Sequence, residues 1–218
     1  MDKTSTFIDL VRYLGQFLIG INTLLFFKSF RFKSTAFKTL TFYLLLTFII
    51  QFYSHYLATK RIHNLFLTHY FFIGQFLLLS FFFLKIIDFK IIKKIIFAGI
   101  LLIPLLLIWN ALSSDPYMDT FNIPEILLTT IPLIIYSFSF LVQKIDSENK
   151  RYIYFNASFF IYTSCSILLF AGENITSEIQ RILSSFNAIL YVFYQFFIFL
   201  EWYKNFRKKP TKEKMIQN

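Results

Sequence analysis

The sequence predicts an all-α, polytopic membrane protein. Of its 218 residues 56% are hydrophobic, and they gather in seven apolar stretches of about 20 residues each. A helix rises 1.5 Å per residue, so about 20 apolar residues cross a hydrocarbon layer of about 30 Å. In lipid the backbone amides can bond only to one another, and the stretches lack the alternation of barrel strands, so helices are expected. The short connecting segments carry positive charge in alternation, which is typical of a chain that crosses a membrane repeatedly.

Each stretch is expected to form one membrane span, seven in all. In chain order the predicted spans are residues 7–27, 39–58, 64–84, 95–112, 123–142, 152–171 and 182–202. Residues 203–218 form a basic tail. The connecting segments are too short for a soluble domain, so residues 1–218 are expected to be a single seven-helix transmembrane domain.

The distribution of Lys and Arg predicts the orientation. The segments after the first, third and fifth spans, together with the tail, hold 17 of the 22 basic residues, whereas the other side holds four. Cytoplasmic segments are enriched in Lys and Arg, so the C-terminus is expected in the cytoplasm and the N-terminus outside, in a bacterial inner membrane. The net charge of +10 is therefore attributed to topology, and no nucleic-acid partner is expected. The tail is expected to contact anionic lipid headgroups.

Polar residues inside the predicted spans are costly in lipid, and this makes them candidates for function. On the first, second and seventh spans they recur at intervals of three or four residues, which places them on one helix face. Counting the rise per residue puts them, with a histidine of the third span, in one layer near the outer boundary. We expect them to line an outward-facing polar cavity that binds a small ligand. The candidate residues are Asp9, Arg12, Gln16, Gln51, His55, His69, Asn187 and Tyr191.

The same residues also allow a structural interpretation. Polar groups in a helix bundle commonly form hydrogen bonds that hold helices together, and Asp9 with Arg12 could be a simple i, i+3 ion pair. His55, His69 and Asp9 are residue types that suit zinc, but no zinc-binding spacing accompanies them, so no metal or cofactor is expected.

Two glutamines, Gln75 and Gln195, are expected near the membrane centre. They belong to two similar segments, Gly-Gln-Phe at 74–76 and Tyr-Gln-Phe at 194–196. The first segment is followed by Lys85 and the second by Lys204. Spans 1–3 and 5–7 run in the same direction, which resembles the parallel 3+1+3 repeat of sugar-efflux transporters of the SWEET type. The Pro-Gln dipeptide of their PQ-loop relatives is absent from this sequence.

Three segments carry a family resemblance. The segment HNLFLTHY at 63–70, the segment YFNAS at 154–158 followed by Tyr162, and residues 187–203 resemble uncharacterised small seven-helix membrane proteins of Bacteroidetes. The resemblance spans most of the chain and implies topology and host group. The chain departs from those relatives at Gln75, where they often carry an acidic residue.

No catalytic set such as Ser/His/Asp, paired carboxylates or a phosphate-binding loop is found in the sequence, so an enzyme is not expected. The leading interpretation is a sensory or receptor-like protein that binds a small ligand and signals through a membrane or cytoplasmic protein partner. The second is a small-solute transporter with a 3+1+3 repeat. The third is an oligomeric accessory or pore-forming protein of a defence or secretion system.

Overall fold

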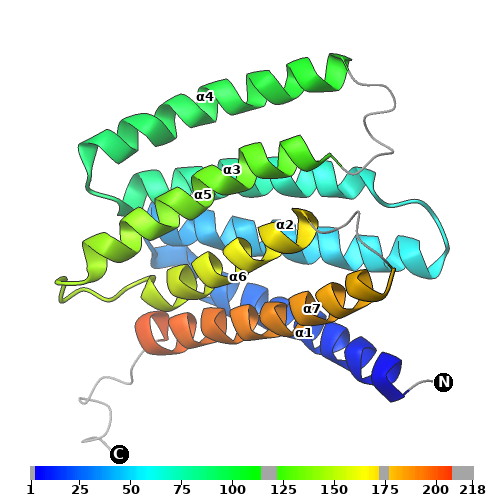
Figure 1. Cartoon of the computed structure of the whole chain (residues 1–218). Helices are drawn as coiled ribbons and strands as arrows, with labels where there is room; N and C mark the ends of the chain where they lie inside the picture. Colours follow the sequence, from blue (N-terminus) through cyan, green and yellow to red (C-terminus); the bar gives the residue numbers. More distant parts are fainter. Residues whose placement is uncertain (1–2, 114–121, 172–176, 208–218) are drawn as a thin grey trace, which may run out of the picture.

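The computed structural model describes residues 3–113, 122–171 and 177–207, and within them it contains seven α-helices and no strand. Successive helices run in opposite directions, side by side (Figure 1). Their bounds are α1 Lys3–Lys28, α2 Thr35–Thr59, α3 Phe66–Ile86, α4 Lys90–Ser113, α5 Ile123–Lys144, α6 Ile153–Ala171 and α7 Ser177–Glu201. A short 3₁₀ turn, Phe30–Phe32, lies between α1 and α2. The prediction of an all-helical fold is confirmed.

Six of the described helices are long and apolar enough to cross a membrane, and only α6 is not among them. The observed helices contain or closely match the seven predicted spans. One boundary differs at the C-terminal end. Trp202–Phe206 forms a π-helical turn that continues α7, and Phe206 is buried in the bundle. The segment 203–206 therefore belongs to the packed structure rather than to a free tail, and the rest of the predicted tail, from 208, lies outside the described residues.

Six of the helices form a closed ring. Going round it, α1 packs against α2, α2 against α3, α3 against α5, α5 against α6, α6 against α7, and α7 against α1. Helix α4 lies outside the ring, where it contacts only α3 and α5 among the principal helix pairs (Figure 1). The ring is therefore made of two groups of three consecutive helices, joined by α4.

Aromatic side chains fill the axis of this ring. Tyr43 of α2, Phe82 of α3, Phe155 of α6 and Tyr194 of α7 are each at most 2% exposed. Phe155 contacts the other three rings, and the Tyr43 and Tyr194 hydroxyls lie 3.2 Å apart. Helices in lipid gain little from hydrophobic burial against one another, so close packing and polar contacts of this kind hold the bundle together.

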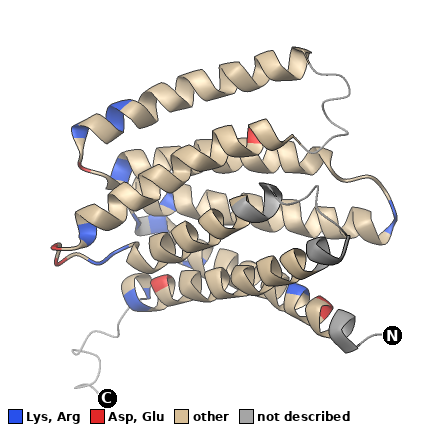
Figure 2. Ribbon diagram, viewed as in Figure 1, with Lys and Arg blue, Asp and Glu red and all other residues tan. Residues whose placement is uncertain are grey.

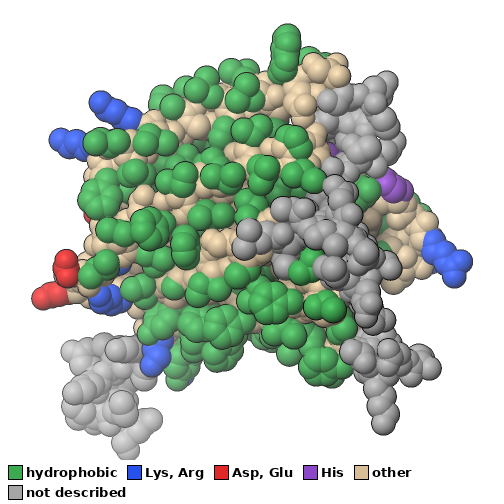
Figure 3. All heavy atoms as spheres, in the orientation of Figure 1, with side chains coloured by type: hydrophobic (Ala, Val, Ile, Leu, Met, Phe, Trp, Pro, Cys, Tyr) green, Lys and Arg blue, Asp and Glu red, His purple; other side chains and the backbone are tan. Residues whose placement is uncertain are grey.

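Charged side chains lie at the helix ends, while the belt between them is largely apolar (Figures 2 and 3). Most Lys and Arg residues are at the end where α1 and α3 finish and α4 and α6 begin. Exposed apolar side chains such as Leu24, Leu105 and Phe138 cover the belt. This distribution is that of a membrane-embedded helical protein.

Candidate functional site

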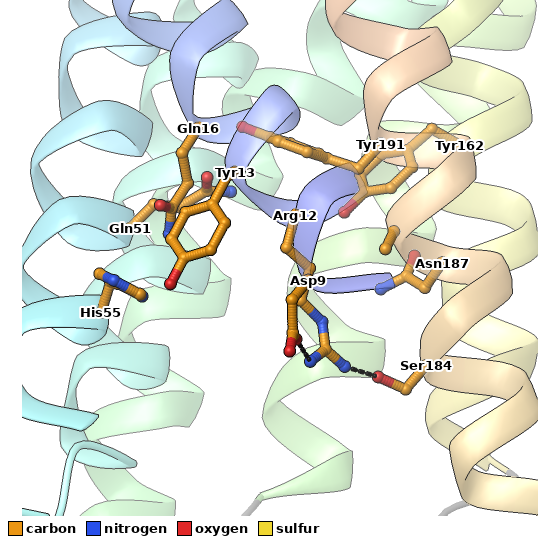
Figure 4. A pocket seen from close by; sticks show the side chains of 11 residues that line it. Asp9, Arg12, Tyr13, Gln16, Gln51, His55, Tyr162, Ser184, Asn187 and Tyr191 are labelled. Atoms are coloured by element: carbon orange, nitrogen blue, oxygen red, sulfur yellow. Dashed lines mark hydrogen bonds and ion pairs between the residues drawn. The ribbon is translucent and has the colours of Figure 1, made fainter. Parts of the chain in front are cut away.

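A polar pocket opens between α1, α2, α6 and α7, towards the end of the bundle that carries the N-terminus. Its volume is about 370 Å³. In Figure 4 the side chains of α2 face those of α7 across the opening, and residues of α1 lie between them. Seven of the eight candidate residues line it: Asp9, Arg12, Gln16, Gln51, His55, Asn187 and Tyr191. Four residues that were not candidates complete the lining: Tyr13, Tyr162, Ser184 and Ala188.

The lining contains one carboxylate, that of Asp9, and one guanidinium, that of Arg12. One guanidinium nitrogen of Arg12 lies 3.2 Å from the Asp9 carboxylate, and the other donates a hydrogen bond of 2.9 Å to the Ser184 hydroxyl of α7 (Figure 4). About half of each charged side chain is exposed. Arg12 thus bridges α1 and α7 at the mouth of the pocket and keeps part of its hydrogen-bonding capacity for another group.

The wall between α1 and α2 carries polar groups that have no protein partner. The side chains of Gln16 and His55 form no hydrogen bond within the described part of the chain, and the Gln51 side chain lies beside the Tyr191 hydroxyl. The His55 ring instead packs edge-on against Tyr13, with ring centroids 5.5 Å apart. Two amides and an imidazole that face a common opening can each donate and accept hydrogen bonds, so this wall can bind water or a polar ligand.

The opposite wall is built on α7. The Asn187 amide oxygen accepts a hydrogen bond of 2.8 Å from Ser166 of α6, which leaves its amide nitrogen towards the pocket side. The Tyr191 hydroxyl, with Gln51 and Gln195 for neighbours, is buried and forms no hydrogen bond. A buried hydroxyl without a partner is destabilising, so Tyr191 is suited to a bound molecule or water.

Gly15 allows α1 to approach this wall closely. A Cβ atom at this position would lie 2.8 Å from the edge of the Tyr191 ring, which is closer than van der Waals contact permits. Any larger residue at position 15 would displace Tyr191, which lines the pocket.

His69, the eighth candidate, does not line the pocket. It is 2% exposed and its Nδ1 atom contacts the carboxylate of Glu125, which is 1% exposed. This contact joins α3 to α5, away from the pocket walls on α1, α2 and α7. Glu125 lies in the first turn of α5.

Gln75 and Gln195 are also outside the pocket. Gln195 is fully buried, and its side-chain and backbone oxygens each accept a hydrogen bond of 2.9 Å from Asn22 of α1. Gln75 is 5% exposed in the packed part of α3. Gln195 therefore helps to join α1 to α7, which is the packing role weighed above for polar groups in the spans.

Glu201, the charged residue at the end of α7, does not lie at the surface of the bundle. Its carboxylate is fully buried at the end of α7 and accepts hydrogen bonds from the backbone N–H groups of Tyr152, Tyr154 and Phe155, at 2.7, 3.0 and 3.4 Å. The first N–H groups of a helix have no partner within it, so Glu201 caps α6 from a different helix. The backbone of Tyr152 has a φ angle of 67°, in the left-handed region that residues other than glycine rarely adopt.

The pocket offers hydrogen-bond donors, hydrogen-bond acceptors and one ion pair, and such groups can bind a polar molecule. Among the described residues no group of three or more His, Cys, Asp or Glu side chains could hold a metal ion. Comparison of the chain with protein-family models, with curated proteins and with solved structures finds no match to any of them.

Proposed function

We propose that this protein is a receptor-like, multi-pass protein of a bacterial inner membrane, of the kind found in Bacteroidetes, that binds a small polar molecule from outside the cell. The observation that carries the proposal is the convergence of seven polar side chains from three helices on one pocket. The side chains of Gln16 and His55 and the hydroxyl of Tyr191 lack a protein hydrogen bond among the described residues, which is unusual for groups placed only to hold helices together.

The orientation in this proposal rests on the positive-inside rule. All seven helices then cross the bilayer, the pocket opens on the outer side, and the end rich in Lys and Arg faces the cytoplasm. The connecting segments on that side are short, so a signal would pass to a partner protein. The ligand would be a small molecule with both donor and acceptor groups, because Arg12, the amides, and Tyr191 offer both.

Cysteine labelling of intact cells tests the proposal. In a Cys165→Ser background, single cysteines would replace Gln16, His55 and Asn187 of the pocket. Matched controls on the same helices would replace Phe17, Phe52 and Ile189, which are exposed on the outside of the bundle, where lipid is expected. A membrane-impermeant maleimide should label the three pocket positions at least about tenfold faster than their controls. Equal, slow labelling of both sets would refute an outward-facing aqueous pocket.

The structure offers one observation in favour of a small-solute transporter as the second candidate. Exchanging α1–α3 for α5–α7 leaves the packing order of the ring unchanged: α3 packs against α5 as α7 packs against α1. Such an arrangement is expected of a 3+1+3 repeat that alternates between two open states. Labelling of Gln16→Cys from the cytoplasmic side, in inverted vesicles, is predicted for the transporter and not for the receptor.

A further inference from the structure

A second polar pocket lies at the opposite end of the bundle, among the basic connecting segments. It has a volume of about 440 Å³. Three stretches of chain form it: the start of α2, the link from α3 to α4, and the link from α5 to α6. Nothing in the ligand-binding role proposed above uses this pocket.

Three cationic side chains surround it. Lys85, Lys144 and Arg151 belong to its lining, and none of them forms an ion pair within the described residues. The one acidic residue of the lining, Asp88, has one carboxylate oxygen occupied by a hydrogen bond of 2.8 Å from Gln143. The lining of the pocket therefore carries three cationic side chains and one carboxylate.

The start of α2 adds hydrogen-bond donors to this charge. Ser34 caps the helix by accepting a hydrogen bond from the N–H of Phe37. The N–H groups of Thr35 and Ala36 lie in the first turn, where no carbonyl of the same helix is available to accept a hydrogen bond from them. Thr35 and Ala36 both line the pocket. Cationic side chains together with helix N-terminal amides form the kind of site that binds phosphate groups.

The surroundings favour a lipid over a soluble molecule. The pocket lies level with the helix ends, where phospholipid headgroups are found, and buried apolar groups such as Phe140 line its inner part. An apolar groove lies on the surface of the bundle and is lined by residues such as Phe89, Ile92 and Val142. It begins at the residue after Asp88, which lines the basic pocket. A headgroup in the basic pocket would thus have an apolar surface nearby for an acyl chain.

We propose that this pocket binds the phosphate group of an anionic phospholipid, with Lys85, Lys144 and Arg151 as its cationic ligands. Basic pockets between transmembrane helices on the cytoplasmic side are suited to lipid headgroups. The site would be occupied by a resident lipid, independently of any ligand in the pocket between α1 and α7.

The test uses the purified full-length chain in detergent, titrated with dioleoyl phosphatidylglycerol, with dioleoyl phosphatidylcholine or with inorganic phosphate, and followed by native mass spectrometry. A triple variant, Lys85→Gln with Lys144→Gln and Arg151→Gln, removes the cations of the pocket. The control triple, Lys38→Gln with Lys93→Gln and Lys94→Gln, removes the same charge from the same end of the bundle without altering the lining. Melting temperatures of both triples establish that they are folded.

The expected result is that phosphatidylglycerol binds the unaltered chain more tightly than phosphatidylcholine. The pocket triple should lose on the order of tenfold in affinity for phosphatidylglycerol relative to the control triple, because it loses charge-assisted hydrogen bonds rather than general attraction alone. Equal losses in the two triples would overturn the proposal in favour of general electrostatics. Binding of inorganic phosphate as tight as that of phosphatidylglycerol, and lost in the pocket triple, would overturn the lipid assignment and indicate a soluble phosphate compound.

Discussion

The two ends of this bundle are built differently. At the end with the basic connecting segments, side chains tie the helices to one another: Glu201 holds the start of α6, Trp202 donates a hydrogen bond to Ser29, and Gln143 bonds to Asp88. At the other end, α1, α2 and α7 surround a pocket in which the side chains of Gln16 and His55 and the hydroxyl of Tyr191 form no hydrogen bond among the described residues. Polar side chains without a protein partner favour a site for another molecule at this end of the bundle.

The largest decrease in the free energy of unfolding is predicted for variants of Glu201, which accepts three backbone hydrogen bonds from the start of α6. Glu201→Ala would leave the N–H groups at the start of α6 without their acceptor in a buried place, and should lower the free energy of unfolding by about 3–5 kcal/mol. Glu201→Gln retains one acceptor oxygen and should cost roughly half as much. Unfolding in mixed detergent micelles measures both. If Glu201→Ala unfolds like the unaltered chain, the two ends do not differ in the way described.

Two histidine variants compare a buried contact between helices, that of His69, with the wall of the pocket, where His55 lies. His69→Ala removes the buried partner of Glu125 and is expected to cost about 2–3 kcal/mol. His55→Ala removes a ring that has an aromatic contact but no hydrogen bond, and is expected to cost less than about 1 kcal/mol. The same unfolding measurement applies to both variants. Equal costs would mean that the contact between α3 and α5 is no more tightly built than the pocket wall.

Gly15→Ala tests whether the close approach of α1 to Tyr191 shapes the pocket. Its methyl group would overlap the Tyr191 ring and should cost about 1–3 kcal/mol. Gly20→Ala is the control, since its methyl group meets the Phe48 ring at 3.3 Å, where a small shift suffices. In addition to stability, the labelling rate of Asn187→Cys should fall in Gly15→Ala and stay unchanged in Gly20→Ala. Unchanged labelling in both would show that Gly15 does not shape the pocket.

The smallest effect on stability is predicted for the ion pair at the pocket mouth. Asp9 and Arg12 are more than half exposed, so Asp9→Asn should change the free energy of unfolding by no more than about 0.5 kcal/mol. A decrease in the free energy of unfolding of more than about 2 kcal/mol would show that the ion pair has a structural role like that of Glu201. The two ends of the bundle would then not differ as described above.

The helices could be predicted from the sequence because apolar length depends on the thickness of a membrane and needs no tertiary information. The polar faces of α1 and α7 could be predicted for a similar reason, since residues three or four apart share a face. His69 shows the limit of this reasoning. Its distance along the helix gives its depth, but not the direction it faces, and it faces α5.

Glu201 shows a second limit. Its partners are backbone N–H groups at the start of α6, almost 50 residues earlier. Because nearly every residue has a backbone N–H group, the residue types do not indicate which of these groups Glu201 binds. Asn22 was missed for the related reason that its partner, Gln195, is distant in the chain. Contacts between helices that are far apart in sequence cannot be derived from spacing along either one.

The position of α4 outside the ring has a consequence for how such a ring can be made. Because α4 reverses the chain direction, α5 runs parallel to α3, and α7 runs parallel to α1. The ring thus has two seams of the same kind, one between α3 and α5 and one between α1 and α7. Two copies of a single three-helix unit, inserted in the same orientation, could close the same ring without α4. Closing this ring within a single chain therefore requires a linking helix outside it, and α4 is that helix.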